Sequence, residues 1–180
     1  ALGKNLIKEI KDYSEYDYVA HFGGYLGNYY LLLFFPEVWS YELFETYIGN
    51  PNNPKMDEIE TSTDYEPYAG RKTYASNTVG GYYAARLGIL EYLKNKKRQS
   101  SVQALRFITD EYYMALGVWV VRQATRHALE SETIGFASKE LMLNYAHLLI
   151  KKKFSFDVKT LINQSVLLKE IKQQTKLSSF

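Results

Sequence analysis

Cysteine is absent from the 180-residue sequence. Its absence excludes a disulfide framework, a cysteine-based zinc site, an iron–sulfur cluster and a cysteine nucleophile within this chain. A chain that needs no disulfides fits a reducing compartment, and we therefore expect a cytoplasmic protein.

Long apolar runs are also missing. The longest one, residues 31–35, is far too short to cross a membrane, so we expect no membrane partner. Residues 1–5 lack the layout of a signal peptide. The first residue is not methionine, and we expect the chain to be a fragment of a longer protein.

Strong net charge is missing as well, because the formal charge is only +2 at pH 7. A value this small does not indicate nucleic-acid binding by itself. Its distribution is uneven: residues 42–66 are mostly acidic among their charged positions, whereas the segment from residue 151 to the end is rich in lysine. This basic segment suits an acidic partner or nearby DNA, and the alternative is a solvated helix face. Hydrophobic residues make up 46% of the chain, which is typical of a globular protein.

The first part of the chain contains strand-like patterns. Residues 5–13 predict a short amphipathic helix, and Gly23-Gly24 is expected to interrupt regular structure. Residues 29–35 are apolar throughout and stop at a proline, which is typical of a strand buried on both faces. Residues 38–48 predict a second strand, and the acidic residues 55–67 predict a loop or an edge strand.

The second part contains more helical patterns. Residues 82–96 and 117–129 predict helices, and the alternating residues 102–109 predict a strand with Arg106 on the face opposite Leu105. Ser138 is expected to begin a further helix whose apolar stripe is formed by Leu141, Tyr145 and Leu148. Asp157 is expected to begin a last helix that runs into the tail.

These elements predict an α+β fold, with a small antiparallel or mixed sheet in the N-terminal half packed by several helices in the C-terminal half. We expect a single α+β domain over residues 1–153 and a C-terminal helix with a tail over residues 154–180.

The last seven residues spell Gln-x-x-Leu-x-x-Phe, because Gln174, Leu177 and Phe180 are spaced by three. This spacing resembles the PCNA-interacting peptide, which docks proteins onto the sliding clamp of DNA replication. In a 3₁₀ turn, residues i and i+3 eclipse, so Leu177 and Phe180 would form one apolar plug and Gln174 would offer its amide. The alternative is a frayed chain end. The peptide usually carries a second aromatic residue, which is absent here.

Two central segments resemble a known family. The first reads YEPYAGRKTYA from Tyr65 and is followed by GGYYAARL from Gly80; the second reads KRQS from Lys97 and leads to LGVWVVRQATR from Leu116. Together they resemble the C-terminal region of the archaeal Nre proteins, a family linked to DNA repair. The resemblance covers about residues 29–129, and it implies a clamp-binding tail where Gln174, Leu177 and Phe180 stand.

The resemblance also implies what this chain does not carry. Fuller Nre chains have an N-terminal portion with a cysteine zinc motif, so we expect any zinc to lie outside this chain and no cofactor or metal within it. Gln123 stands where the family pattern suggests an acid, which puts an acidic role at that position in doubt.

Cationic side chains cluster in the same segments. Guanidinium groups form forked hydrogen bonds with phosphates, so a DNA backbone or a nucleotide is a natural ligand for them. The alternative is internal ion pairing with Glu91, Glu130, Asp110 or Glu111. The candidate phosphate-binding residues are Arg71, Lys72, Arg86, Arg98, Arg122 and Arg126.

Two further features allow both a functional and a structural interpretation. Gly80-Gly81 precedes a helix and could present backbone amides to an anion, or it could form a tight turn. The sequence has 17 tyrosines, which could stack on bases or pack in the core; the pairs of interest are Tyr82-Tyr83 and Tyr112-Tyr113.

Catalysis has little support in the sequence. The three histidines are far apart, whereas Asp110-Glu111 follows a predicted strand, a position that nucleases use for metal-binding carboxylates. We therefore expect a DNA-repair accessory protein that binds the sliding clamp, with DNA as a candidate second partner. The alternatives are a metal-dependent nuclease or nucleotide-acting enzyme that uses Asp110 or Glu111, and a purely structural interaction subunit.

Overall fold

The computed structural model describes residues 2–53, 55–78, 80–112 and 117–177. Six strands form one mixed sheet in the order β4-β3-β5-β2-β1-β6. Their bounds are β1 Tyr18–Tyr25, β2 Asn28–Phe35, β3 Ser40–Gly49, β4 Glu60–Glu66, β5 Ser101–Thr109 and β6 Ile134–Phe136. Neighbouring strands are antiparallel except for the central pair β3 and β5, which is parallel.

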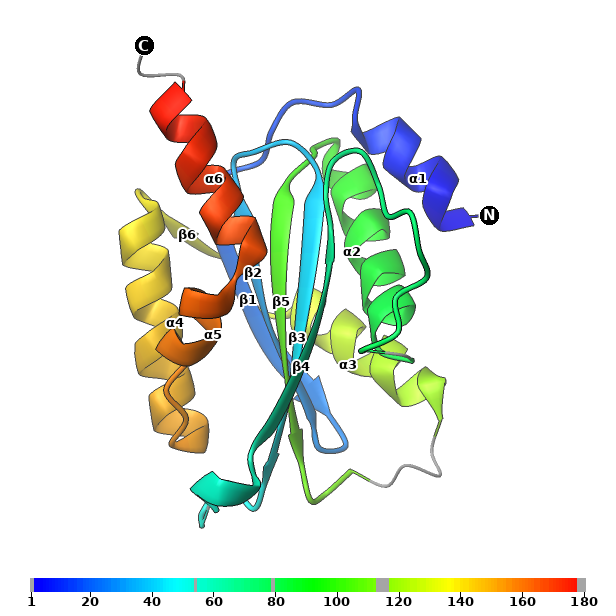
Figure 1. The fold of residues 1–180 in the computed structure, drawn as a ribbon. Helices are drawn as coiled ribbons and strands as arrows, with labels where there is room; N and C mark the ends of the chain where they lie inside the picture. Colours follow the sequence, from blue (N-terminus) through cyan, green and yellow to red (C-terminus); the bar gives the residue numbers. More distant parts are fainter. Residues whose placement is uncertain (1, 54, 79, 113–116, 178–180) are drawn as a thin grey trace.

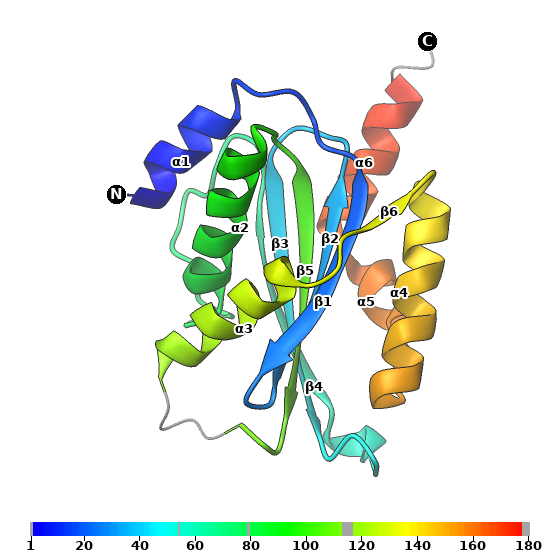
Figure 2. The ribbon, with the colours of Figure 1, turned by 180° about the vertical axis from the view of Figure 1, so that it is seen from behind.

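Helices cover both faces of the sheet, as Figures 1 and 2 show from opposite sides. One face carries α1 Leu2–Ile10, α2 Tyr82–Lys96 and α3 Val118–Glu130. The other carries α4 Lys139–Phe154, α5 Lys159–Gln164 and α6 Val166–Leu177. A short 3₁₀ helix, Met56–Glu58, lies between β3 and β4. This arrangement confirms the expected α+β class. Within the described ranges, no helix is both long enough and apolar enough to cross a membrane.

The sheet separates two hydrophobic cores, and β2 shows why. Side chains of a strand alternate between its faces, so Tyr30, Leu32 and Phe34 pack with α1–α3, whereas Leu31 and Leu33 pack with α4–α6. All five are fully buried. A strand between two helix layers must be apolar at every position, which confirms the prediction for residues 29–35.

Strand β1 was not expected, because Gly23-Gly24 was taken to interrupt regular structure. That prediction was wrong: β1 continues through both glycines and pairs with β2 and β6. A Cβ atom at Gly23 would lie 2.8 Å from the backbone of Ala128 in α3. The glycine therefore lets α3 cross close to the strand. β6 has only three residues, too few for a periodic signal.

Helix α4 begins where expected, but it buries a different face. Ser138 caps the helix by accepting a hydrogen bond from the backbone amide of Leu141 at 3.2 Å. The predicted stripe is wrong, because Leu141 and Leu148 are 55% and 59% exposed. Met142, Ala146, Ile150 and Phe154 face the core instead. Two overlapping apolar rows lie on this helix, and packing against the sheet selects the second.

The expected single helix after Asp157 is two helices. Asp157 accepts a hydrogen bond from the backbone amide of Lys159 at 3.0 Å, near the start of α5. The chain then turns extended at Ser165, and α6 begins at Val166. The sequence gives no Gly or Pro at this break. The cause is a tertiary contact with a carboxylate on β3.

That carboxylate belongs to Glu42, which caps the first turn of α6. Its Oε2 accepts from the backbone amides of Val166 at 2.8 Å and Leu167 at 3.2 Å. Its Oε1 accepts from the Ser165 hydroxyl at 2.5 Å and from Nε2 of Gln103 at 3.1 Å. The first amides of a helix lack internal partners, and a negative charge also complements the helix dipole there. Glu42 is 1% exposed and fixes α6 to the sheet.

Candidate functional site

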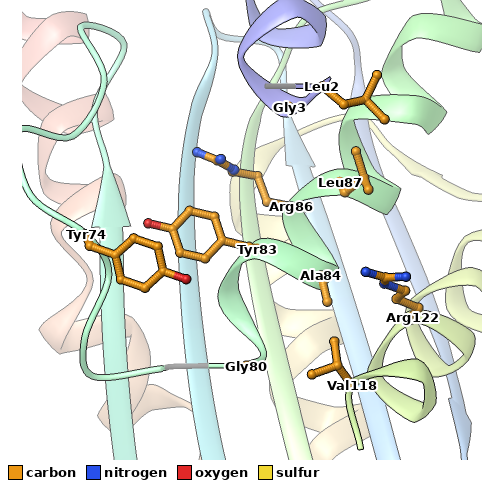
Figure 3. Close-up of a pocket in the computed structure, with 10 residues that line it drawn as sticks. All are labelled: Leu2, Gly3, Tyr74, Gly80, Tyr83, Ala84, Arg86, Leu87, Val118 and Arg122. Atoms are coloured by element: carbon orange, nitrogen blue, oxygen red, sulfur yellow. The ribbon is translucent and has the colours of Figure 1, made fainter.

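A groove runs between α1, α2 and the segment that follows β4. It consists of two cavities of about 400 and 670 Å³ that share Gly3, Tyr74, Tyr83 and Arg86. We call it the α1–α2 groove. Figure 3 shows the smaller cavity, with Tyr74 and Tyr83 on one side and Arg122 on another.

Asp64, at the end of β4, holds the segment that forms the groove wall. Its Oδ2 accepts from the backbone amides of Asn77 at 3.0 Å and Thr78 at 2.8 Å, and from the Thr78 hydroxyl at 2.8 Å. Its Oδ1 lies 3.3 Å from Nη1 of Arg71. One buried carboxylate therefore gathers the irregular residues between β4 and α2.

Arg71 works inside this wall. Its guanidinium donates to the backbone carbonyls of Tyr65 at 2.9 Å, Thr73 at 3.1 Å and Tyr74 at 3.3 Å. Because most of its donors are occupied by the protein, Arg71 shapes the groove more than it presents free charge.

Arg86 reaches into the groove from α2. Its Nη1 donates to Oε1 of Glu66 at 2.7 Å, and its guanidinium lies 4.8 Å from the ring centroid of Tyr83. The internal partners of Arg71 and Arg86 are thus Asp64 and Glu66. The expected partners were wrong, because the carboxylates that meet Arg71 and Arg86 stand on the preceding strand β4. Those expected partners were Glu91, Glu130, Asp110 and Glu111.

The remaining candidate cations divide into two groups. Lys72 and Arg122 are exposed and line the groove. Arg98 follows the far end of α2, where its Nη1 donates to the carbonyl of Lys97 at 2.9 Å. Arg126 is one turn beyond Arg122 on α3, outside the groove lining. The structure therefore brings four of the six candidates together.

The C-terminal tail is the second candidate site. Residues 172–177 at the end of α6 are all exposed, and Leu177 is 77% exposed. The expected 3₁₀ turn is not present in the described part, because α6 stays α-helical through Leu177. Gln174 and Leu177 still lie on neighbouring positions of one helix face. Phe180 lies outside the described residues.

Comparison with known proteins decides the family. A model described as "Archaeal Nre, C-terminal" matches residues 66–180, and one described as "Archaeal Nre, N-terminal" matches residues 1–51. The chain belongs to the archaeal Nre family. The match reaches further toward the N-terminus than the C-terminal region that the motifs suggested.

Three relatives illustrate the similarity. The DNA repair protein NreA of Haloferax volcanii is 34% identical over 73% of this chain, and NreA of Archaeoglobus fulgidus is 36% identical over 84%. DNA repair protein NreB of Archaeoglobus fulgidus is 31% identical over 97%. These matches cover 32%, 39% and 44% of the relatives, so the chain spans less than half of their length. No solved structure matches this Nre chain.

The predicted carboxylate pair, Asp110 and Glu111, lies in no metal-binding cluster of the residues that the structure describes. Asp110 and Glu111 are exposed in the turn after β5, where the Asp110 amide donates to the Gly49 carbonyl at 2.9 Å. Across the described ranges, no group of three or more His, Asp or Glu side chains could hold a metal ion. The nuclease alternative therefore gains no supporting observation.

Three lysines, two on α1 and one just after it, were missed as site residues. The sequence pattern predicted only a short amphipathic helix in this region, yet these lysines line the larger cavity together with Lys72. The spacing of four and then three residues was the available signal, because it places them on one helix face. These residues are Lys4, Lys8 and Lys11.

A buried ionic cluster beside the groove was also missed. Arg106, 5% exposed on β5, donates to Glu45 and to the side-chain oxygen of Asn28. Burial by itself lowers the pKa of Arg106. The neighbouring Tyr30 and Glu45 outweigh this effect and raise the pKa above its ordinary value, so the guanidinium stays charged. Burial also raises the pKa of Tyr30 to about 12. The sequence did contain a signal for this cluster. An arginine in a strand that is otherwise largely apolar is almost never buried without a partner, so Arg106 indicated a buried acid nearby.

Gly81 is required by this cluster. A Cβ atom there would overlap the carboxylate of Glu45 and lie 3.1 Å from Nη1 of Arg106. Gly80 adopts a φ of 87°, which favours glycine, and lines both the α1–α2 groove and a third cavity of about 210 Å³. The Gly-Gly pair therefore fits α2 closely over the cluster.

Proposed function

We propose that this chain is a DNA-repair accessory unit that docks on the sliding clamp through Gln174, Leu177 and Phe180. The observation that carries the proposal is the exposure of the last six described residues of α6, with a leucine 77% exposed at their end. Burial of such a large apolar side chain by a partner removes it from water, which lowers the free energy of the complex. The relatives' names, DNA repair proteins NreA and NreB, support the setting.

The expected affinity is modest. Full burial of Leu177 and Phe180 contributes about 1.5–3 kcal/mol each before ordering costs, which corresponds to micromolar binding or weaker. Titrating a matched sliding clamp into the chain by calorimetry should give saturable binding. Phe180→Ala and Leu177→Ala should each weaken it at least tenfold.

The matched control is Leu148→Ala, since Leu148 is 59% exposed on α4, away from the tail. This variant should bind the clamp like the parent chain. Unchanged binding by Phe180→Ala and Leu177→Ala would remove the tail from the interaction. Equal losses in all three variants would point to another apolar surface.

We further infer that the α1–α2 groove contacts nucleic-acid phosphates. Its larger cavity is lined by six cationic side chains and by one acidic one, Glu66, which is already paired with Arg86. Basic side chains that neutralise phosphates release counterions, so binding weakens as salt rises.

The salt dependence gives the test. Lys8→Ala, Lys72→Ala and Arg122→Ala should each lower the slope of log affinity against log salt by about 0.9 for duplex DNA. Arg98→Ala and Arg126→Ala are matched controls, because both are exposed arginines outside the groove lining. Fluorescence anisotropy with a labelled duplex measures all five. Equal slopes in both sets would place the DNA contact elsewhere.

A further inference from the structure

The floor of the α1–α2 groove holds buried polar atoms without partners. Trp39 is fully buried and Glu66 is 4% exposed, and both line the larger cavity. Among the described residues, Nε1 of Trp39 and Oε2 of Glu66 have no hydrogen-bond partner. An unsatisfied buried polar atom is costly, so a ligand that reaches the floor of this cavity can stabilise the site by supplying an acceptor to the indole and a donor to the carboxylate.

An aromatic wall stands beside these atoms. The rings of Tyr74 and Tyr83 stack with centroids 4.6 Å apart, and Tyr74 is 69% exposed. The Tyr83 hydroxyl accepts a hydrogen bond from the backbone amide of Ala75 at 3.0 Å, which fixes its ring. Tyr83 supports Tyr74 from behind, so the exposed ring of Tyr74 is a platform for a planar ring.

Cations surround the mouth of the cavity. Lys4 and Lys8 on α1 and Lys72 on the opposite wall are exposed. Lys11 is held at the rim, where its Nζ donates to the Tyr68 carbonyl at 2.6 Å and lies 4.1 Å from that ring's centroid. The cavity, at about 670 Å³, has the size of small-molecule sites, which occupy about 300–1,000 Å³.

We propose that the α1–α2 groove binds one unstacked nucleotide, with its base stacked on Tyr74, its base edge at Trp39 and Glu66, and its phosphate at the rim lysines. The edge of a base offers hydrogen-bond donors beside acceptors, so Glu66 accepts and Trp39 donates. The proposal rests on the phosphate contact proposed above and adds the base pocket to it.

The carboxylate orients the ligand. A phosphate or an acidic peptide at the floor would bring acceptor oxygens and negative charge against the free oxygen of Glu66, which repels both. A base edge brings N–H donors to the same oxygen. The phosphate therefore belongs at the lysine rim and the base at the floor. A free nucleotide and a nucleotide unstacked from a single strand share this chemistry.

The chain offers its own reporter for the test. It contains two tryptophans, and Trp119 on α3 packs near Tyr25, outside the groove lining. In a Trp119→Phe variant, tryptophan fluorescence, excited selectively over tyrosine, comes from Trp39 alone. Titration with the four deoxynucleoside monophosphates should give a saturable change. Deoxyribose 5-phosphate and inorganic phosphate should bind at least tenfold more weakly.

Two variants test the pocket. Glu66→Gln keeps the shape and an oxygen for Arg86 but replaces the free acceptor with a donor, so nucleotide affinity should fall at least tenfold while phosphate binding does not fall. Tyr74→Ala should cost about tenfold through lost stacking. Tyr47→Ala is its matched control, because Tyr47 is 47% exposed on β3 outside the groove lining, and it should change nothing.

The outcomes separate this proposal from the phosphate contact. Equal binding of nucleotide and base-free phosphate would overturn the base pocket and leave an anion site. Salt-dependent DNA binding without any Trp39 response would overturn the pocket and leave the phosphate contact intact. Loss of both would remove the groove from nucleic-acid binding. Tighter binding of a dC oligonucleotide than of dCMP would identify a single strand as the source.

Discussion

Replacing Glu42 with alanine is expected to lower the free energy of unfolding by about 3–4 kcal/mol, because four hydrogen bonds end on this one buried carboxylate. The variant leaves the amides of Val166 and Leu167 without an acceptor and removes the negative charge at the start of α6. Urea unfolding followed by circular dichroism measures the loss. Among the backbone amides, those in the first turn of α6 should show the largest increase in hydrogen-exchange rate relative to the parent chain.

Glu60→Ala is the matched control, since Glu60 is exposed on the neighbouring edge strand. It should change stability by less than about 0.5 kcal/mol. A Glu42→Ala variant as stable as this control, with unchanged exchange in α6, would show that the cap does not hold the helix.

The acid form of Glu42 gives a second readout. Burial raises its pKa above the ordinary value of 4.5, although the hydrogen bonds from Ser165 and Gln103 oppose the shift. The folded state therefore binds the proton more tightly than the unfolded state, so this group's contribution to stability falls as pH rises from about 4.5 through the raised pKa. Glu42→Gln should remove that fall. An unchanged pH profile would show that Glu42 does not titrate in this range.

Replacing Arg106 with methionine is the second substitution with a large expected effect. It leaves the largely buried Glu45 carboxylate and the buried Asn28 side-chain oxygen without their donor, and breaking one side of a buried ion pair typically costs about 3–5 kcal/mol. Methionine retains much of the volume, so the loss comes mainly from the unpaired charge. Thermal and urea unfolding should both show it.

A double substitution isolates the pair. Arg106→Met with Glu45→Gln removes both charges, so it should be more stable than Arg106→Met alone. Arg98→Met, on an exposed arginine, is the matched control and should be nearly neutral. If Arg106→Met is as stable as this control, the cluster contributes little to the fold.

Most of the sheet could be predicted from sequence, because burial leaves a direct mark on a strand. Residues 29–35 are apolar throughout since they lie between two cores, and residues 102–109 alternate around Arg106. β1 could not be predicted, since its glycines serve the approach of α3 rather than the local backbone. The face of α4 likewise depended on which of two apolar rows meets the sheet.

The candidate site was predictable in part. The motif around Arg71, Lys72 and Arg86 marks one groove wall, because these residues are close in sequence as well as in space. The lysines at residues 4, 8 and 11 and Trp39 come from other parts of the chain, and only the folded chain brings them next to this motif and its Glu66. The roles of Asp64 and Glu42 were hidden for the same reason: each carboxylate holds a segment distant from it in sequence.

The parallel pairing of β3 with β5 has a consequence for how the groove arises. These neighbouring strands are separated in sequence by β4, the groove wall and α2, which together form one long crossover. Bringing the two ends of such a crossover together lowers the entropy of the chain before stabilising contacts form. Pairing of strands that are distant in sequence therefore slows folding. We therefore expect the groove to form late in folding, because its wall belongs to a segment whose two ends lead into the central strands of the sheet. Insertions or losses within that segment can remodel the ligand surface while the strand ladder that frames it stays the same.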